Sequence, residues 1–284
     1  MMGPTELFVV VVVVVAIGFW ISRRLQSDDE YIARWADATG VEITPEQAPY
    51  VRRYLDWSRR GRRIGALVGF VSPWLYSAIS GRTFDEGAWA VATMLVGYLL
   101  GALVAEIVVN RALESGPAAV MQPRRLTDYL PGHLLMWQRA LGVLSLAMIV
   151  PYAIAQPAEA IDLPGVGSIA SYALGGASIA VIVELIERAI VARRQSMADL
   201  ADVKVDDALR STSIHVVAAA GFALLIQFVG PLVAITLVAA LPEPPAGVVG
   251  GVTIVLAFLF SLACWISIAR PNGSMVRRGV RSAA

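Results

Sequence analysis

The feature that most restricts the fold of this chain is a series of seven apolar runs separated by polar segments. Most of these runs are about as long as a helix that crosses a bilayer, which needs about 20 residues. They cover residues 7–21, 64–80, 88–110, 140–156, 166–187, 213–241 and 246–269. The pattern predicts an all-α integral membrane protein with seven transmembrane helices, because a helix satisfies its own backbone hydrogen bonds inside a membrane.

The composition favours the same class. Of the 284 residues, 57% are hydrophobic and 16% are charged, whereas about 25% of the residues of a soluble domain are charged. The net charge of +1 gives no reason to expect a nucleic-acid partner. Lys204 is the only lysine, and this preference for arginine is typical of GC-rich bacterial genes. We therefore expect a bacterial plasma-membrane protein whose surroundings are the lipid bilayer.

The basic residues predict the topology. Of the 23 lysines and arginines, 22 lie in residues 22–63, 110–139, 188–212 and 270–284, and the exception is Arg82. Basic residues favour the cytoplasmic side of a membrane. This distribution predicts an N-terminus outside the cell and a C-terminus in the cytoplasm.

The first 63 residues divide into two predicted parts. Residues 1–22 are expected to form an uncleaved transmembrane anchor, because no basic residue precedes the apolar run and Arg23 and Arg24 follow it directly. Residues 23–63 predict a cytoplasmic helical segment. A first helix is expected from Ser27 through Trp35, with Gly40 ending it.

A second helix is expected to begin around Pro45. Thr44, Pro45 and Gln47 supply a cap, a proline at the first helical position and a capping-box partner. Arginines and aromatic residues alternate along this helix up to Arg63. Such a helix fits the anionic headgroup region of a membrane, and it also fits a docking surface for a cytoplasmic partner.

Residues 64–284 predict a six-helix transmembrane bundle that is built from three similar hairpins. The repeats cover about 52–113, 124–193 and 203–271, and in each a proline is followed by a second marked residue 33 positions later. These pairs are Pro73 and Glu106, Pro151 and Glu184, and Pro231 and Cys264, and the arginines that follow them are Arg111, Arg188 and Arg270. Hairpins of one orientation can pack around a pseudo-threefold axis.

Glu106 and Glu184 are the candidate functional residues, because ionisable groups inside membrane helices are costly and often functional. They could couple transport to an ion, together with Arg111 and Arg188. Alternatively, arginines at the inner edge could satisfy a ring of carboxylates that closes the bundle. Glu184 stands four residues before Arg188, which favours an ion pair, and Glu187 is expected at the membrane interface.

The prolines Pro73, Pro151 and Pro231 also have two interpretations. Proline is tolerated in membrane helices where neighbouring groups satisfy the freed carbonyl. The kinks could therefore shape the packing, or they could act as hinges of a gated cavity.

No catalytic or cofactor-binding residues are predicted. His133, His215 and Cys264 are too few and too scattered for a metal site, and no Walker phosphate loop is present. Two functional classes remain: a non-enzymatic accessory or scaffold subunit with a membrane-protein partner or as a homo-oligomer, and a transporter of small solutes or ions. Transport needs polar groups at the membrane midplane, and their scarcity here favours the first class.

Overall fold

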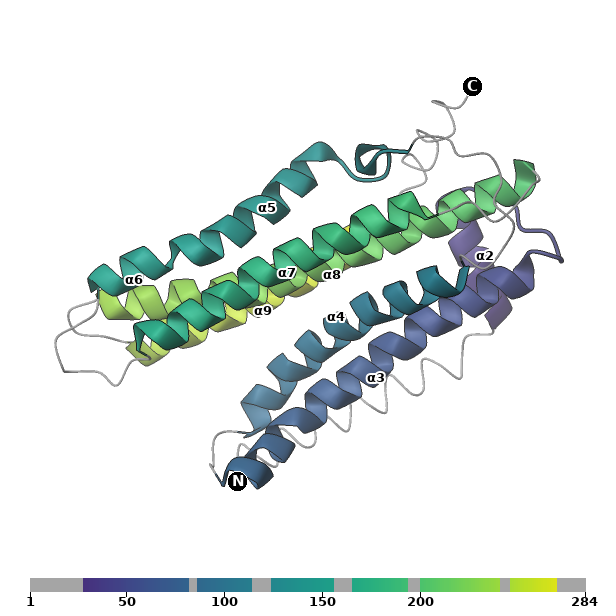
Figure 1. The fold of residues 1–284 in the computed structure, drawn as a ribbon. Coiled ribbons are helices and arrows are strands. Elements are labelled where there is room, and N and C mark those ends of the chain that lie inside the picture. Colours follow the sequence, from purple (N-terminus) through teal and green to yellow (C-terminus); the bar gives the residue numbers. More distant parts are fainter. Residues whose placement is uncertain are drawn as a thin grey trace. The chain divides into compact units, whose positions relative to one another are not determined.

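The computed structural model describes residues 28–81, 86–113, 124–155, 165–193, 200–240 and 246–269. All regular secondary structure in these residues is helical (Figure 1). The all-α prediction is therefore confirmed for this part of the chain. The predicted anchor at residues 1–22 lies outside it.

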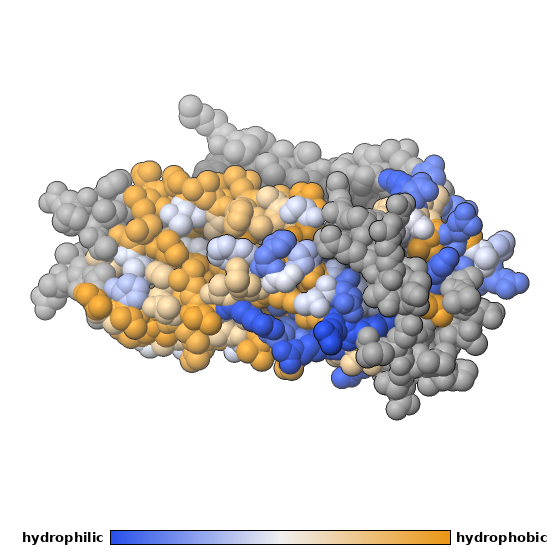
Figure 2. Space-filling model, turned by 90° about the horizontal axis from the view of Figure 1, so that it is seen from above, coloured by the Kyte–Doolittle hydropathy of each residue, from blue (hydrophilic) through white to orange (hydrophobic). Residues whose placement is uncertain are grey.

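Five helical segments are long and apolar enough to cross a membrane. They are Ala92–Arg111, Gly132–Ile154, Val166–Ala192, Val203–Ala239 and Gly251–Ile268. Hydrophobic residues cover long stretches of the surface, as Figure 2 shows. The prediction of a membrane protein is confirmed by the length and composition of these five segments. The apolar run at 64–80 forms the C-terminal half of a longer helix and is not one of the five.

The polar segment folds into α2 (Asp28–Thr39) and the first half of α3 (Ala48–Ser80). Gly40 follows α2 with a φ of 68°, a left-handed conformation that glycine adopts without a steric penalty. Gln47 Oε1 accepts the backbone N–H of Thr44 at 3.1 Å, which is one half of the predicted capping box. The α-helix begins at Ala48 rather than at Pro45, because residues 45–47 form a tighter turn in which the Gln47 N–H bonds to the Thr44 carbonyl.

The chain divides into two compact units, which are residues 1–112 with 198–209, and residues 113–197 with 210–284. In the first unit α3 packs against α4 (Glu86–Leu113) through glycines at four-residue spacing. A Cβ added at Gly65 would overlap the carbonyl oxygen of Gly97, and one at Gly101 would overlap that of Gly61. The two backbones therefore touch, a contact that only glycine permits.

The second unit contains five helices and part of a sixth. They are η1 (Leu126–Asp128), α5 (Gly132–Ala147), α6 (Ile149–Ala155), α7 (Val166–Ala192), α8 (Leu200–Ala240) from residue 210 onward, and α9 (Ala246–Ile268). The helices containing the runs at 140–156 and 213–241 begin at Gly132 and Leu200, well before the expected spans. The apolar run marks the part of a helix that is in hydrocarbon, whereas the backbone hydrogen bonds continue beyond it.

The three prolines affect their helices differently. Pro73 lies inside α3 and Pro231 lies inside α8, and both helices remain continuous. The run with Pro151 is divided at Met148 into α5 and α6. Pro151 has no N–H to donate to the carbonyl of Ala147, four residues earlier, and the helix is interrupted there; the same missing N–H at Pro73 and Pro231 leaves their helices continuous.

Candidate functional site

Glu106 is completely buried between α3 and α4. Its Oε2 accepts a hydrogen bond of 3.0 Å from the Tyr54 hydroxyl, and its Oε1 accepts one of 2.8 Å from the Ser58 hydroxyl. Tyr54 and Ser58 are four residues apart, so they lie on one face of α3. That face continues through Gly61 and Gly65. Glu106 therefore lies where the glycine contact between the two helices ends.

Arg111 does not form the expected closing contact with Glu106. Its side chain is exposed, and hydroxyl groups from α3 occupy both carboxylate oxygens of Glu106. The side-chain amide of Asn110 also bonds to the backbone carbonyl of Glu106 at 2.6 Å. The alternative of arginine partners therefore does not describe Glu106, whose partners come from a helix that precedes it by about 50 residues.

Glu184 of α7 has two arginine partners. Arg188 forms the predicted ion pair from one turn later in the same helix. Arg139 of α5 adds a two-pronged contact, with Nε 3.0 Å from Oε2 and Nη2 2.7 Å from Oε1. The Arg139 contact joins α5 to α7, and no local spacing in the sequence could reveal it.

Glu187, which was expected at the membrane interface, is completely buried among the helices. It lies on the buried stripe of α7 in step with Val183 and Ile190. The Gln138 amide is 3.5 Å from Oε2, and Oε1 has no hydrogen-bond partner in the described part of the chain. The three- and four-residue spacing to buried apolar positions is the signal that could have placed it.

Arg210 is fully buried. From the sequence alone, it is only one of the basic residues predicted on the cytoplasmic side of the membrane. Its Nη1 donates to the backbone carbonyls of Ile190, Val191 and Arg193 at 3.2, 2.8 and 2.9 Å. These carbonyls lie at the C-terminal end of α7, where the last carbonyls of a helix lack partners within it, although the Ile190 carbonyl also accepts the Arg193 N–H at 3.3 Å. A cation at this end also offsets the helix dipole.

The third hairpin has no carboxylate at the equivalent place. Cys264 of α9 is half-buried and packs against an apolar cluster of Phe222, Ile226 and Ala257. The predicted repeat position is therefore polar in two hairpins and apolar in the third.

Among the residues described, no three His, Cys, Asp or Glu side chains lie close enough to hold a metal ion. His215 Nδ1 bonds to the backbone carbonyl of Ser211 at 2.8 Å within its own helix. The polar groups of the described spans thus bond either within their own helix or between helices, and Glu106, Glu184 and Arg210 are of the second kind. The chain matches no protein-family model, no curated protein and no solved structure.

Proposed function

We propose that this protein is a non-enzymatic accessory or scaffold subunit of a complex in the bacterial plasma membrane. The observation that carries the proposal is the occupation of Glu106 and Glu184, the two carboxylates that a transporter would use for coupling. Each is held by side chains from the other helix of its hairpin. Groups that are engaged in this way stabilise a fixed bundle.

The uncovered apolar faces of the helices also support the proposal. Large hydrophobic side chains of α5, α7 and α9 remain exposed, including Met136 at 58%, Leu185 at 60% and Phe260 at 61%. In a membrane such faces contact either lipid or the helices of a partner. A scaffold subunit leaves these outer faces available for a partner.

The arrangement in three hairpins is part of the proposal, and it rests on the positions where paired helices meet. Gly65 meets Gly101 in the first hairpin, Gly142 meets Ala180 in the second, and Ala223 accepts a hydrogen bond from Ser261 in the third. These contacts stand at similar places in the predicted repeats, because Gly65, Gly142 and Ala223 come eight, nine and eight residues before Pro73, Pro151 and Pro231. This agreement supports a repeated unit with one register.

The topology of seven spans, with the N-terminus outside, rests on the distribution of basic residues. It can be tested with single cysteines in a chain whose own cysteine is removed by Cys264→Ser. A membrane-impermeant maleimide should label Ser168→Cys in intact cells, and it should label Glu42→Cys only after the membrane is opened. Both positions are exposed, so a reagent on the same side of the membrane can reach them. The reverse labelling pattern would show that the chain has the opposite orientation.

Site-specific photo-crosslinking tests the accessory role directly. A photoreactive amino acid would replace Met136, Leu185 or Phe260, and the buried Val183 would serve as the matched control position. The proposal predicts a crosslink to one defined membrane protein from at least one exposed position, and only internal crosslinks from position 183. Crosslinks to lipid alone from every exposed position would contradict it.

Transport is the second candidate, and the buried Glu187 favours it. A carboxyl group with an unpartnered oxygen inside a membrane bundle lowers the stability of the fold. Such groups are therefore rare unless a function requires them. If it carries protons, Glu187→Gln should abolish proton uptake into proteoliposomes without lowering the melting temperature. If Glu187 is only a packing residue, the substitution leaves any flux unchanged.

A further inference from the structure

The exposed side chains of α3 form one continuous stripe that changes from basic to apolar along the helix. Arg53, Trp57 and Arg60 are followed by Ile64, Leu67, Val71 and Leu75 at steps of three and four residues. Residues with this spacing lie on one face of a helix. Trp57 is 46% exposed, and Ile64 and Leu67 are 63% and 64% exposed.

The face of α3 that packs against α4 lies beside the stripe, about 100° around the helix, because its residues follow those of the stripe by one position. Tyr54 and Ser58 reach Glu106 from it, and Gly61 and Gly65 touch the α4 backbone there. The stripe is left uncovered by this contact. If the apolar half of α3 lies in the membrane, Ile64 and Leu67 face acyl chains, and the basic residues lie directly beneath those chains.

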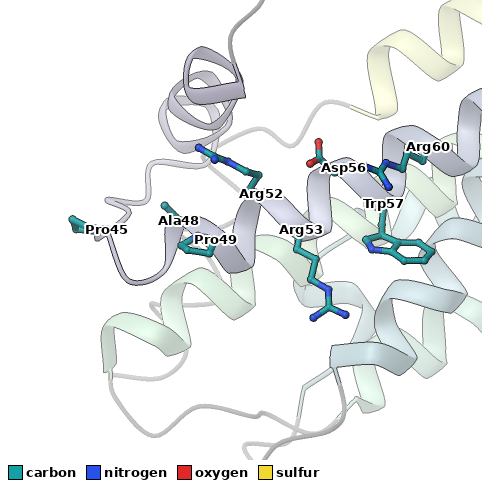
Figure 3. Close-up of a pocket in the computed structure, with 8 residues that line it drawn as sticks. All are labelled: Pro45, Ala48, Pro49, Arg52, Arg53, Asp56, Trp57 and Arg60. Atoms are coloured by element: carbon teal, nitrogen blue, oxygen red, sulfur yellow. The ribbon is translucent and has the colours of Figure 1, made fainter.

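A groove occupies the basic part of this stripe. It has a volume of about 510 Å³ and is lined by Pro45, Ala48, Pro49, Arg52, Arg53, Asp56, Trp57 and Arg60 (Figure 3). Three guanidinium groups and one carboxylate give the lining a positive charge. Arg52 is engaged by Asp29. Arg53 and Arg60 have no ion pair or side-chain hydrogen bond within the described residues.

Arg60 lies within the depth of the headgroup layer, and Trp57 and Arg53 lie on its aqueous side. Arg60 precedes Ile64 by four residues, Trp57 by seven and Arg53 by eleven, which at 1.5 Å per residue is about 6, 10 and 16 Å along the helix. The headgroup layer extends about 5–8 Å beyond each side of the hydrocarbon core. Tryptophan is enriched near the membrane interface, and an arginine side chain can reach further along the helix.

We propose that this groove binds the phosphate group of an anionic phospholipid. Arg60, which lies nearer to Ile64 than Arg53 does, donates hydrogen bonds to the phosphate oxygens, and Trp57 and Arg53 line the aqueous side of the headgroup. The continuous stripe selects a lipid over a free anion, because only an amphipathic molecule places a phosphate beside Arg60 and acyl chains beside Ile64 at the same time. The proposal is independent of whether the protein has a partner subunit.

The test is native mass spectrometry of the full-length protein released from mixed micelles of phosphatidylglycerol and phosphatidylcholine. Wild-type protein should retain one phosphatidylglycerol in preference to phosphatidylcholine. Arg53→Gln with Arg60→Gln should weaken that retention about 30-fold, because each basic residue near an anionic surface contributes about fivefold. Arg34→Gln with Arg125→Gln removes the same charge at exposed positions outside the groove and should leave retention unchanged.

Three results would overturn the proposal. Equal retention of the two lipids by wild-type protein would remove the selectivity, and this comparison does not depend on any variant folding. An equal loss in the Arg34 and Arg125 control would reduce the effect to general surface charge. Displacement of phosphatidylglycerol by inorganic phosphate at equal concentration would assign the groove to a free anion instead.

Discussion

The Ser58 hydroxyl donates a 2.8 Å hydrogen bond to Oε1 of Glu106, and this bond joins α3 to α4 at a site with no exposure to solvent on the carboxylate. The Tyr54 hydroxyl occupies the other oxygen. Directly beyond this contact the glycines of both helices meet backbone to backbone. A polar clasp at one end and a glycine contact along the rest therefore define the first hairpin.

The clasp can be measured with a double-mutant cycle of Ser58→Ala and Glu106→Ala. Hydrogen bonds between membrane helices contribute on average about 0.6 kcal/mol and at most about 1.7 kcal/mol in such cycles. We expect a coupling energy toward the upper end of this range, because both groups are buried. The measurement is reversible unfolding in mixed micelles. A coupling energy near zero would show that the bond does not hold the hairpin together.

The glycine contact predicts a strong dependence on side-chain size. Gly65→Ala places a methyl group against the carbonyl oxygen of Gly97, and overpacking of this kind costs about 1–3 kcal/mol. The melting temperature in mild detergent should fall accordingly. Gly167→Ala is the matched control, because an added Cβ there meets no atom within 4 Å. Equal effects at both positions would contradict close packing of α3 on α4.

The two arginines that contact Glu184 should differ in importance. Arg139 binds across helices with two nitrogens, whereas Arg188 binds from the same helix. Both arginines are more than half exposed, so the energies are those of solvent-screened pairs. We expect about 0.5–1 kcal/mol of coupling with Arg139 and about 0.3–0.5 kcal/mol with Arg188. Double-mutant cycles that combine Glu184→Gln with a substitution of each arginine measure the two coupling energies. A larger coupling energy with Arg188 than with Arg139 would contradict the prediction.

Arg210 should be among the most sensitive positions of the second unit. Arg210→Ala removes this donor from three backbone carbonyls at the end of α7. The Ile190 carbonyl keeps the Arg193 N–H, whereas the Val191 and Arg193 carbonyls lose this partner, and each unsatisfied buried group costs about 1–3 kcal/mol. Arg210→Lys keeps the charge but offers a single compact donor group, so its stability should be intermediate. Thermal unfolding of both variants in detergent is the measurement. A stable Arg210→Ala protein would mean that other groups cap the helix.

Features that depend on local periodicity could be predicted from the sequence. The start of α7 at Val166, the extent of α9 and the break at Gly40 follow from apolar runs and a single glycine. The Glu184–Arg188 pair follows from a four-residue spacing. Each of these is determined within a few neighbouring residues, so one sequence contains the whole signal.

Contacts between separate helices could not be predicted in this way. Tyr54 and Ser58 lie about 50 residues before Glu106, and Arg139 lies 45 residues before Glu184. Pairing them requires the rotation of each helix about its axis, which depends on packing across the whole hairpin. The glycines of α3 offered a partial signal, because Gly61, Gly65 and Gly69 repeat every four residues and so mark the face that meets α4.

The most direct test of the proposed role is the native mass and composition of the protein purified from its own membrane in a mild detergent. If the protein is an accessory subunit, it should purify as a complex that contains a second protein in fixed stoichiometry. A monomer or homo-oligomer of this chain alone, stable in the same detergent, would contradict the proposal of a partner complex. Transport through Glu187 would then be the favoured function.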